Sequence, residues 1–308
     1  MSISYTLLIT PSQADSYMND GIDLCGGFAI VSSDIASVVR VEDFISLFHG
    51  TIDGSPFSPD RPVDILEIPA DPFVQARHAV GPLDPRAVLG GIIELPPFDG
   101  TGRVQTALTS ADLLWIEPTR IPIGSQLKRY YPGRPEPQHV ATYHGVAWGW
   151  QAEATQSFSA FIPSPFIGAT IQRDWGDVPV DVEYGDDGSI VALTLISPTE
   201  PKMEQGFEKI ESGMWAKRIA YRPGMEVREK HMVGRVGNIP VRILRTMRDE
   251  DGELFAFCVS LLLDMPLVLA SGFVRWGQAY AVTTVPFVSV KPSVQYVPYV
   301  PLADDVPV

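Results

Sequence analysis

Closely spaced turn signals in the last two thirds of the sequence restrict its fold more than any other feature. From Thr101 onward, glycine- and proline-rich turns recur about every 8 to 12 residues, and helical periodicity nearly disappears. Short strands are predicted at Asp112 to Pro118, His139 to Ala147, Val178 to Tyr184, Ile190 to Ile196, Val241 to Met247 and Leu254 to Leu262. Such spacing is typical of small β-barrels and sandwiches. We therefore predict a mainly-β region with two small barrel-like or sandwich-like units, at residues 106–200 and 201–290.

The first hundred residues differ, because helix-like segments alternate there with strand-like ones. Short helices are predicted at Ser12 to Met18 and at Glu42 to Phe48, each followed by a turn signal. Strands are predicted at Tyr5 to Thr10, Gly26 to Val31, Asp64 to Ile68 and Leu89 to Leu95. Residues 1–105 are therefore expected to form an α+β domain.

Acidic residues are concentrated in this first domain. The chain carries 37 Asp and Glu against 23 Lys and Arg, which gives a formal net charge of −14. Residues 1–100 hold 14 of the acids and only 4 arginines, so their net charge is −10. This excess argues against a general nucleic-acid-binding protein, which needs cationic side chains to neutralise phosphates. The acidic residues either only solvate the surface of the domain or attract a basic partner to it.

A proline-rich tail ends the sequence. Prolines stand at positions 286, 292, 298, 301 and 307, between valines and aromatic residues. Because proline fixes φ and lacks an N–H, residues 291–308 are predicted to be extended. The tail could wrap the chain's own core as an edge strand, or it could pack on a partner or on a second copy. Tyr296 and Tyr299, together with Trp148 and Trp150, are the candidate interaction residues, since aromatic anchors dominate many binding surfaces.

Several functional classes lack their sequence signatures here. No stretch of about 18 uncharged apolar residues predicts a membrane span, and the N-terminus has no basic leader followed by an apolar centre. We therefore expect a cytoplasmic protein without membrane insertion. Cys25 and Cys258 form no CxxC pair, and His139 and His144 have an odd spacing on a predicted strand, so no metal site is predicted. No phosphate-binding glycine loop or nucleophile elbow occurs, and no cofactor is predicted.

One short motif offers an enzymatic alternative. Phe48-His49-Gly50-Thr51 resembles the His-Gly-Thr element that opens the NAD-binding cleft of ADP-ribosyltransferase-like folds. The resemblance covers four residues, and the glycine-tyrosine strand expected downstream is missing. It implies NAD as the substrate and Glu94 as the acid that stabilises an oxocarbenium-like transition state. Arg77 and His78 stand together in the same acidic region, so the catalytic candidates are His49, Arg77, His78 and Glu94.

Three functional hypotheses follow from these observations. The missing catalytic signatures, the concentrated charge and the tail favour a non-enzymatic interaction protein, such as an inhibitor or immunity partner. It would mask a basic protein partner through the acidic domain and the loops of the β units. The first alternative is an NAD- or nucleotide-using enzyme, similar to an ADP-ribosyltransferase or an NAD glycohydrolase, in the N-terminal domain. The second is a structural subunit of a larger assembly, which would use the same surfaces.

Overall fold

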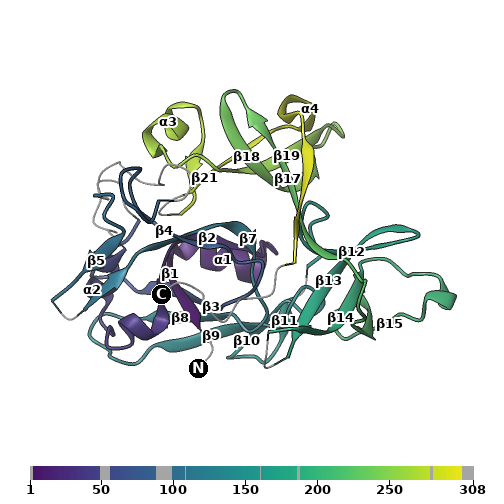
Figure 1. Cartoon of the computed structure of the whole chain (residues 1–308), viewed down its shortest axis with the longest axis horizontal. Coiled ribbons are helices and arrows are strands. Elements are labelled where there is room, and N and C mark those ends of the chain that lie inside the picture. The colour runs from purple at the N-terminus through teal and green to yellow at the C-terminus, as the bar shows by residue number, and fades with distance from the viewer. Residues whose placement is uncertain are drawn as a thin grey trace.

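Two large antiparallel sheets make up most of the chain (Figure 1). The computed structural model describes residues 3–48, 56–87, 99–107, 109–159, 161–185, 188–277 and 280–299. Of these residues, 47% lie in strands and 12% lie in helices. The protein is therefore mostly β.

The first sheet is built from residues 4–159. Within the described residues it has nine strands, in the spatial order β11 (Phe158–Ser159), β10 (Trp150–Ala152), β9 (Gln138–Tyr143), β8 (Gln126–Tyr130), β3 (Val63–Pro69), β1 (Ser4–Ile9), β2 (Leu24–Val31), β7 (Leu114–Arg120) and β4 (Ala76–His78). A separate hairpin is formed by β5 (Arg103–Gln105) and β6 (Ser110–Asp112). Strands from the acidic first hundred residues therefore share one sheet with strands that follow them.

Two short helices and a 3₁₀ turn accompany this sheet. They are α1 (Pro11–Asn19), η1 (Ser32–Ile35) and α2 (Val41–Leu47). The start of α1 is fixed by a capping box, in which the Thr10 hydroxyl accepts from the Gln13 backbone N–H and the Gln13 side chain accepts from the Thr10 N–H. Both helices coincide with segments that the sequence predicts to be helical.

The first sheet buries apolar side chains on both of its faces. Side chains alternate along β1, so Leu7 and Ile9 join Tyr17 of α1 in one core, while Leu8 joins Phe44 of α2 in the other. One helix therefore packs on each face, and the sheet has a continuous apolar interior on either side.

The second sheet is built from residues 167–298. Within the described residues its order is β15 (Glu208–Lys209), β16 (Trp215–Ala220), β14 (Ile190–Ser197), β13 (Gly176–Tyr184), β12 (Ile167–Arg173), β17 (Val227–Val236), β18 (Ile239–Arg248), β19 (Leu254–Ser260), β21 (Ala281–Pro286) and β20 (Val274–Arg275). Its connections contain η2 (Met203–Gln205), α3 (Met265–Ala270) and α4 (Phe287–Val290). The tail contributes β22 (Ser293–Pro298), which pairs with β17 on the edge opposite β12.

This second sheet divides into two lobes with separate cores, at the top and at the right of Figure 1. The upper core includes Val241 and Cys258, and the right-hand core includes Val180 and Leu193. The long strand β17 joins the lobes, because it pairs with β12 over residues 227–231 and with β18 over residues 233–236.

The predicted fold class is correct in part. The mainly-β character is confirmed, whereas the two predicted barrel-like units are replaced by open sheets, and the helical share of the N-terminal α+β domain is small. Neither lobe closes, because β17 changes partner along its length and connects the lobes. The strands of segment 106–200 divide between the sheets, with β6 to β11 on the side of the first and β12 to β14 in the second. The predicted strand at residues 89–95 lies outside the described residues.

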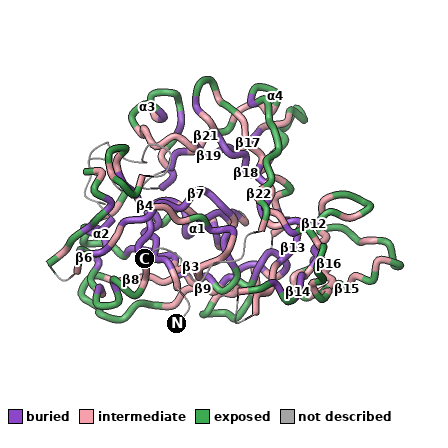
Figure 2. The backbone as a smooth tube through the Cα atoms, in the orientation of Figure 1, coloured by how far each residue is buried: buried purple, intermediate pink, exposed green. Residues whose placement is uncertain are grey.

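The second sheet packs on the first along β7, and we call this contact the seam. Trp115 of β7 lies 5.6 Å from Tyr280, centroid to centroid, and the Tyr280 hydroxyl donates to the Ile116 carbonyl at 2.9 Å. Leu244 and Val259 of the second sheet belong to the same core as Trp115. Figure 2 shows buried residues in β7 and also in the strands β18 and β13 of the second sheet. In the described part of the chain, no helix is long and apolar enough to span a membrane.

Candidate functional site

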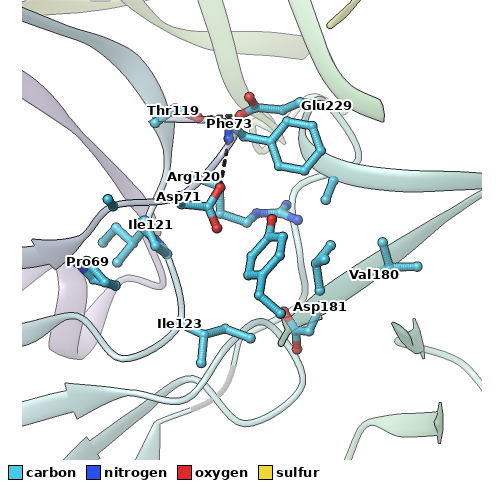
Figure 3. Close-up of a pocket in the computed structure, with 15 residues that line it drawn as sticks. Pro69, Asp71, Phe73, Thr119, Arg120, Ile121, Ile123, Val180, Asp181 and Glu229 are labelled. Carbon is cyan, nitrogen blue, oxygen red and sulfur yellow. Dashed lines mark hydrogen bonds between the residues drawn. The ribbon is translucent and has the colours of Figure 1, made fainter. Parts of the chain in front are cut away.

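A small pocket opens where the seam meets the right-hand lobe, and we call it the seam pocket. Its first wall comes from the first sheet, with residues 69–71, 73 and 119–123. Its second wall comes from the second sheet, with residues 169, 180–182, 184 and 229. The volume is about 160 Å³, which is enough for a few water molecules or a small organic group. Figure 3 shows charged side chains from both walls around this space.

Asp71 stands in the loop that follows β3. Its Oδ1 accepts from the backbone N–H of Phe73 at 2.8 Å, which holds the carboxyl at the pocket wall. Burial raises the pKa of Asp71 to about 6, and the negative charge of Glu229 acts in the same direction. The buried hydroxyl of Tyr184 is close to this carboxyl. No described residue stands in hydrogen-bond geometry to this hydroxyl. Asp71 is therefore a carboxyl that changes its charge near pH 6.

Asp181, on β13, has a different environment. Its Oδ1 accepts from the N–H of Val146 at 2.8 Å, and its Oδ2 accepts from the N–H of Ala147 at 3.0 Å. Burial raises the pKa of Asp181 to about 6, although both backbone donors stabilise the charged form. A Cβ on Gly145, where φ is +96°, would lie 2.6 Å from Asp181 Oδ2, so this turn requires glycine. Asp181 thus ties the second sheet to a turn of the first.

Arg120 ends β7 and places a guanidinium in the pocket (Figure 3). Its side chain is only 9% exposed, and its Nε lies 2.9 Å from Oδ2 of Asp23. Its Nη2 donates to the carbonyls of Ser164, at 3.2 Å, and of Ile167. Its Nη1 is buried and has no hydrogen-bond partner among the described residues. Only glycine fits at position 168, because a Cβ there would lie 2.2 Å from the guanidinium carbon.

Glu229 comes from β17 and reaches across the seam. The Thr119 hydroxyl donates to its Oε1, and His231 Nε2 lies 3.3 Å from its Oε2. Glu229 and His231 are two residues apart on a strand, so they share the face that is buried against β7. The neighbouring Arg228 and Lys230 are half-buried on the other face. The polar groups of the seam therefore follow from strand alternation.

Beyond Glu229, the seam continues as a row of charges. Glu117 lies 3.2 Å from Arg77 through Oε1 and 3.6 Å from Arg242 through Oε2. Arg242 is 5% exposed, and burial lowers the pKa of its guanidinium while Glu229 and Glu117 oppose that change. We use the name polar seam for Glu117, Thr119, Glu229, His231 and Arg242.

Two of the four predicted catalytic candidates belong to the described residues. Arg77 pairs with Glu117 and so touches the polar seam. His78 follows Arg77 on β4, so the two side chains point to opposite faces of that strand. His49 and Glu94 lie outside the described residues. The catalytic set of four therefore stays a prediction.

Both tryptophans that the sequence predicts as interaction residues pack against other aromatic rings. Trp150 is 2% exposed and packs between Tyr17, at 5.8 Å, and Tyr143, at 5.3 Å between ring centroids. Trp148 is half-buried against Phe158 at 5.4 Å. The core thus holds Trp150, and Trp148 keeps only part of its ring exposed.

The two predicted tyrosines lie on the tail. Tyr296 is 40% exposed, and the guanidinium of Arg228 stands 4.1 Å from the centre of its ring. Tyr299 is half-buried, and its ring centroid lies 6.0 Å from that of Phe73 and 6.2 Å from that of Tyr184. Because Phe73 and Tyr184 line the seam pocket, the tail supports the pocket wall from behind.

The principal residues of the seam pocket, Asp71, Arg120, Asp181, Tyr184 and Glu229, are not singled out by the sequence. The available signal is the pattern Glu229-Lys-His231 inside a predicted β region, where both faces of a strand are polar. No group of three or more His, Cys, Asp or Glu side chains among the described residues is arranged to hold a metal ion. No protein family, curated protein or solved structure matches this chain.

Proposed function

We propose that this chain is a non-enzymatic binding protein that receives a cationic group of its partner in the seam pocket. The observation that carries the proposal is the charge of the pocket lining. Asp71, Asp181 and Glu229 come from three different elements, and Arg120 is the one cation among the described lining residues. Arg120 is itself paired with a further carboxylate, Asp23.

The surroundings of the pocket act in the same direction. The first hundred residues, which supply the Asp71 wall, carry a net charge of −10. Negative charges around a concave, low-dielectric surface raise the local concentration of cations and accelerate their association. A partner with a basic surface fits this field.

The engagement of the carboxyl groups supports binding more than proton transfer. Both oxygens of Asp181 accept from backbone N–H groups, and Glu229 accepts from Thr119. These hydrogen bonds fix the positions of the Asp181 and Glu229 carboxyl groups and favour their charged forms. Asp71 accepts one backbone N–H, from Phe73 through Oδ1, and the Tyr184 hydroxyl is also close to this carboxyl, which lines the pocket.

Titration with ethylammonium ion, followed by NMR of the Phe73 backbone N–H that donates to Asp71, tests the proposal. For so small a cation we expect a dissociation constant on the order of 1 mM. Asp71→Asn should weaken binding about tenfold, because it removes the charge and keeps the acceptor for Phe73. Asp60→Asn is the matched control, since Asp60 is an exposed acid of the same first hundred residues. Absence of binding, or equal affinities of the two variants, would overturn the proposal.

A further inference from the structure

We infer that the cation received by the seam pocket is an α-ammonium group with a carbonyl beside it, as in a free amino acid or the amino end of a peptide. This inference rests on the proposed function and names the chemistry of the ligand. The hydrogen-bond donors of the pocket support it, in addition to the acceptors that support the proposed function.

The first step is the unused N–H of Arg120. Nη2 donates to two backbone carbonyls, and Nε lies 2.9 Å from Asp23 Oδ2 in an ion pair that does not meet hydrogen-bond geometry. Nη1 has no partner among the described residues, although the side chain is only 9% exposed. Buried N–H groups nearly always have an acceptor. A ligand that enters this pocket therefore gains by bringing an oxygen to Nη1.

The second step is that donors and acceptors stand close together in this pocket. The Tyr184 hydroxyl, buried and without a hydrogen bond to the described residues, is close to the Asp71 carboxyl. Figure 3 shows the Arg120 guanidinium extending into the space between Asp71 and Asp181. A ligand that satisfies these groups must offer a positively charged donor and an oxygen acceptor a few bonds apart.

An α-amino carbonyl unit has this arrangement, because its ammonium nitrogen and carbonyl oxygen are separated by three covalent bonds. The ammonium would face Asp71 and the carbonyl would face Arg120 Nη1 and the Tyr184 hydroxyl. Lysine and arginine side chains offer only donors, so they would leave Nη1 without an acceptor and bring like charges together. A carboxylate alone would meet three acidic side chains. The capture of an amino terminus by converging polar groups is a known mode of peptide recognition.

The size of the pocket agrees with a small ligand of this kind. About 160 Å³ can hold an aminoacyl group with a short side chain. The remaining lining includes Ala169, Val180 and Val182 of the second sheet, so an apolar side chain is favoured over a charged one.

The test is an NMR titration of the full chain with matched probes. Glycinamide should bind at least tenfold more tightly than ethylammonium, and N-acetylglycinamide, which lacks the charge, should not bind. Comparing glycine with glycylglycinamide distinguishes a free amino acid from a peptide amino end, and a preference for either supports the inference. If ethylammonium binds as tightly as glycinamide, the inference is overturned while the proposed function stands. If neither binds, both are overturned.

A pair of tyrosine variants provides a second readout. Tyr184→Phe should weaken glycinamide binding about threefold to tenfold and ethylammonium binding by less, because both probes use the Asp71 carboxyl beside this hydroxyl but only the carbonyl of glycinamide uses the hydroxyl itself. Tyr221→Phe is the matched control, since its hydroxyl donates to the Met225 carbonyl in the connection between β16 and β17 and lies outside the pocket lining. Equal loss of affinity for both probes in Tyr184→Phe would contradict the assignment.

Discussion

The two sheets bury their interiors in different ways. The first sheet has an apolar core on each face, with α1 on one side and α2 on the other. The second sheet divides into two lobes with small cores, and its strands β17 and β18 present Glu229, His231 and Arg242 to the first sheet. The first sheet is thus covered on both faces by apolar contacts, while the second sheet is held against the first in part by polar contacts.

This difference explains where the candidate site lies. Apolar packing is tolerant of direction, whereas hydrogen bonds and ion pairs fix the relative position of the groups that make them. Buried ion pairs contribute little net stability, because desolvation of the charges offsets their attraction. The polar seam therefore positions the second sheet more than it stabilises it. The seam pocket stands at the end of this row, where charged groups are already held in place.

The largest expected effect is in the core of the first sheet. Trp150→Ala removes an aromatic side chain that is 2% exposed and packs on two tyrosines, so it should lower the free energy of unfolding by about 4 kcal/mol. Urea denaturation measures the change. Trp175→Ala, at a 55% exposed position in the turn between β12 and β13, should stay within about 0.5 kcal/mol of the native chain. A cost below about 1 kcal/mol for Trp150→Ala would mean that the first sheet does not depend on this core.

The next effect is local to the seam. Glu229→Ala leaves His231 buried without its carboxylate and removes one of the two carboxylates, Glu229 and Glu117, that favour the charge of Arg242, so it should destabilise the chain by about 3 kcal/mol. Hydrogen exchange should show faster opening of β17 to β19 and unchanged protection of β1, β2 and β3, because regions open separately where their contacts are separate. Glu226→Ala, an exposed acid just before β17, is the control. Equal loss of protection in both sheets would show that the two sheets unfold as one unit and would contradict separate opening of the second sheet.

The sequence predicts the parts of this architecture that depend on local chemistry. Turn spacing locates β7, β9, β13, β14, β18 and β19 but misses other strands of residues 112–262, and the turn signal after residue 18 locates the end of α1. The same signals do not report which strands become neighbours. For this reason, segment 106–200 reads as one unit although β7 to β11 join the first sheet and β12 to β14 join the second. Long-range pairing depends on which faces bury each other, and a single strand's pattern does not contain that information.

The site is less predictable for the same reason. Asp71 and Glu229 are 158 positions apart, and each is an ordinary acid in its own segment. Only the packing of β17 on β7 makes Glu229 a buried group beside the pocket. Arg77 is the predicted candidate that reaches the polar seam, through Glu117 on the neighbouring strand. Its proximity to His78 in the sequence suggested a pair, but adjacent strand residues point to opposite faces.

The smallest expected effect is a gain in stability on replacing Asp71. This gain would distinguish a role of Asp71 in binding from a role in folding. The pKa of Asp71 is raised from 3.8 to about 6, so between these pH values the folded chain holds a proton that the unfolded chain has released. The stabilisation that this bound proton gives to the folded chain is full below about pH 4 and is lost as the pH rises through 6. Asp71→Asn stays neutral, so it should match the native chain at pH 4 and exceed its stability at pH 7.5. The shift corresponds to at most about 3 kcal/mol, and we expect about 1 kcal/mol because the side chain is partly exposed.

Urea denaturation at the two pH values measures this difference. Asp181, whose pKa is also raised to about 6, remains in both chains, so only the difference between variant and native chain reports on Asp71. Asp60→Asn, at an exposed position, should show no such gain at pH 7.5. A variant that is less stable than the native chain at pH 7.5 would show that the ionised carboxyl is stabilised in the fold. A variant that gains stability and loses cation binding would place Asp71 among residues that are kept for a ligand at a cost to the fold.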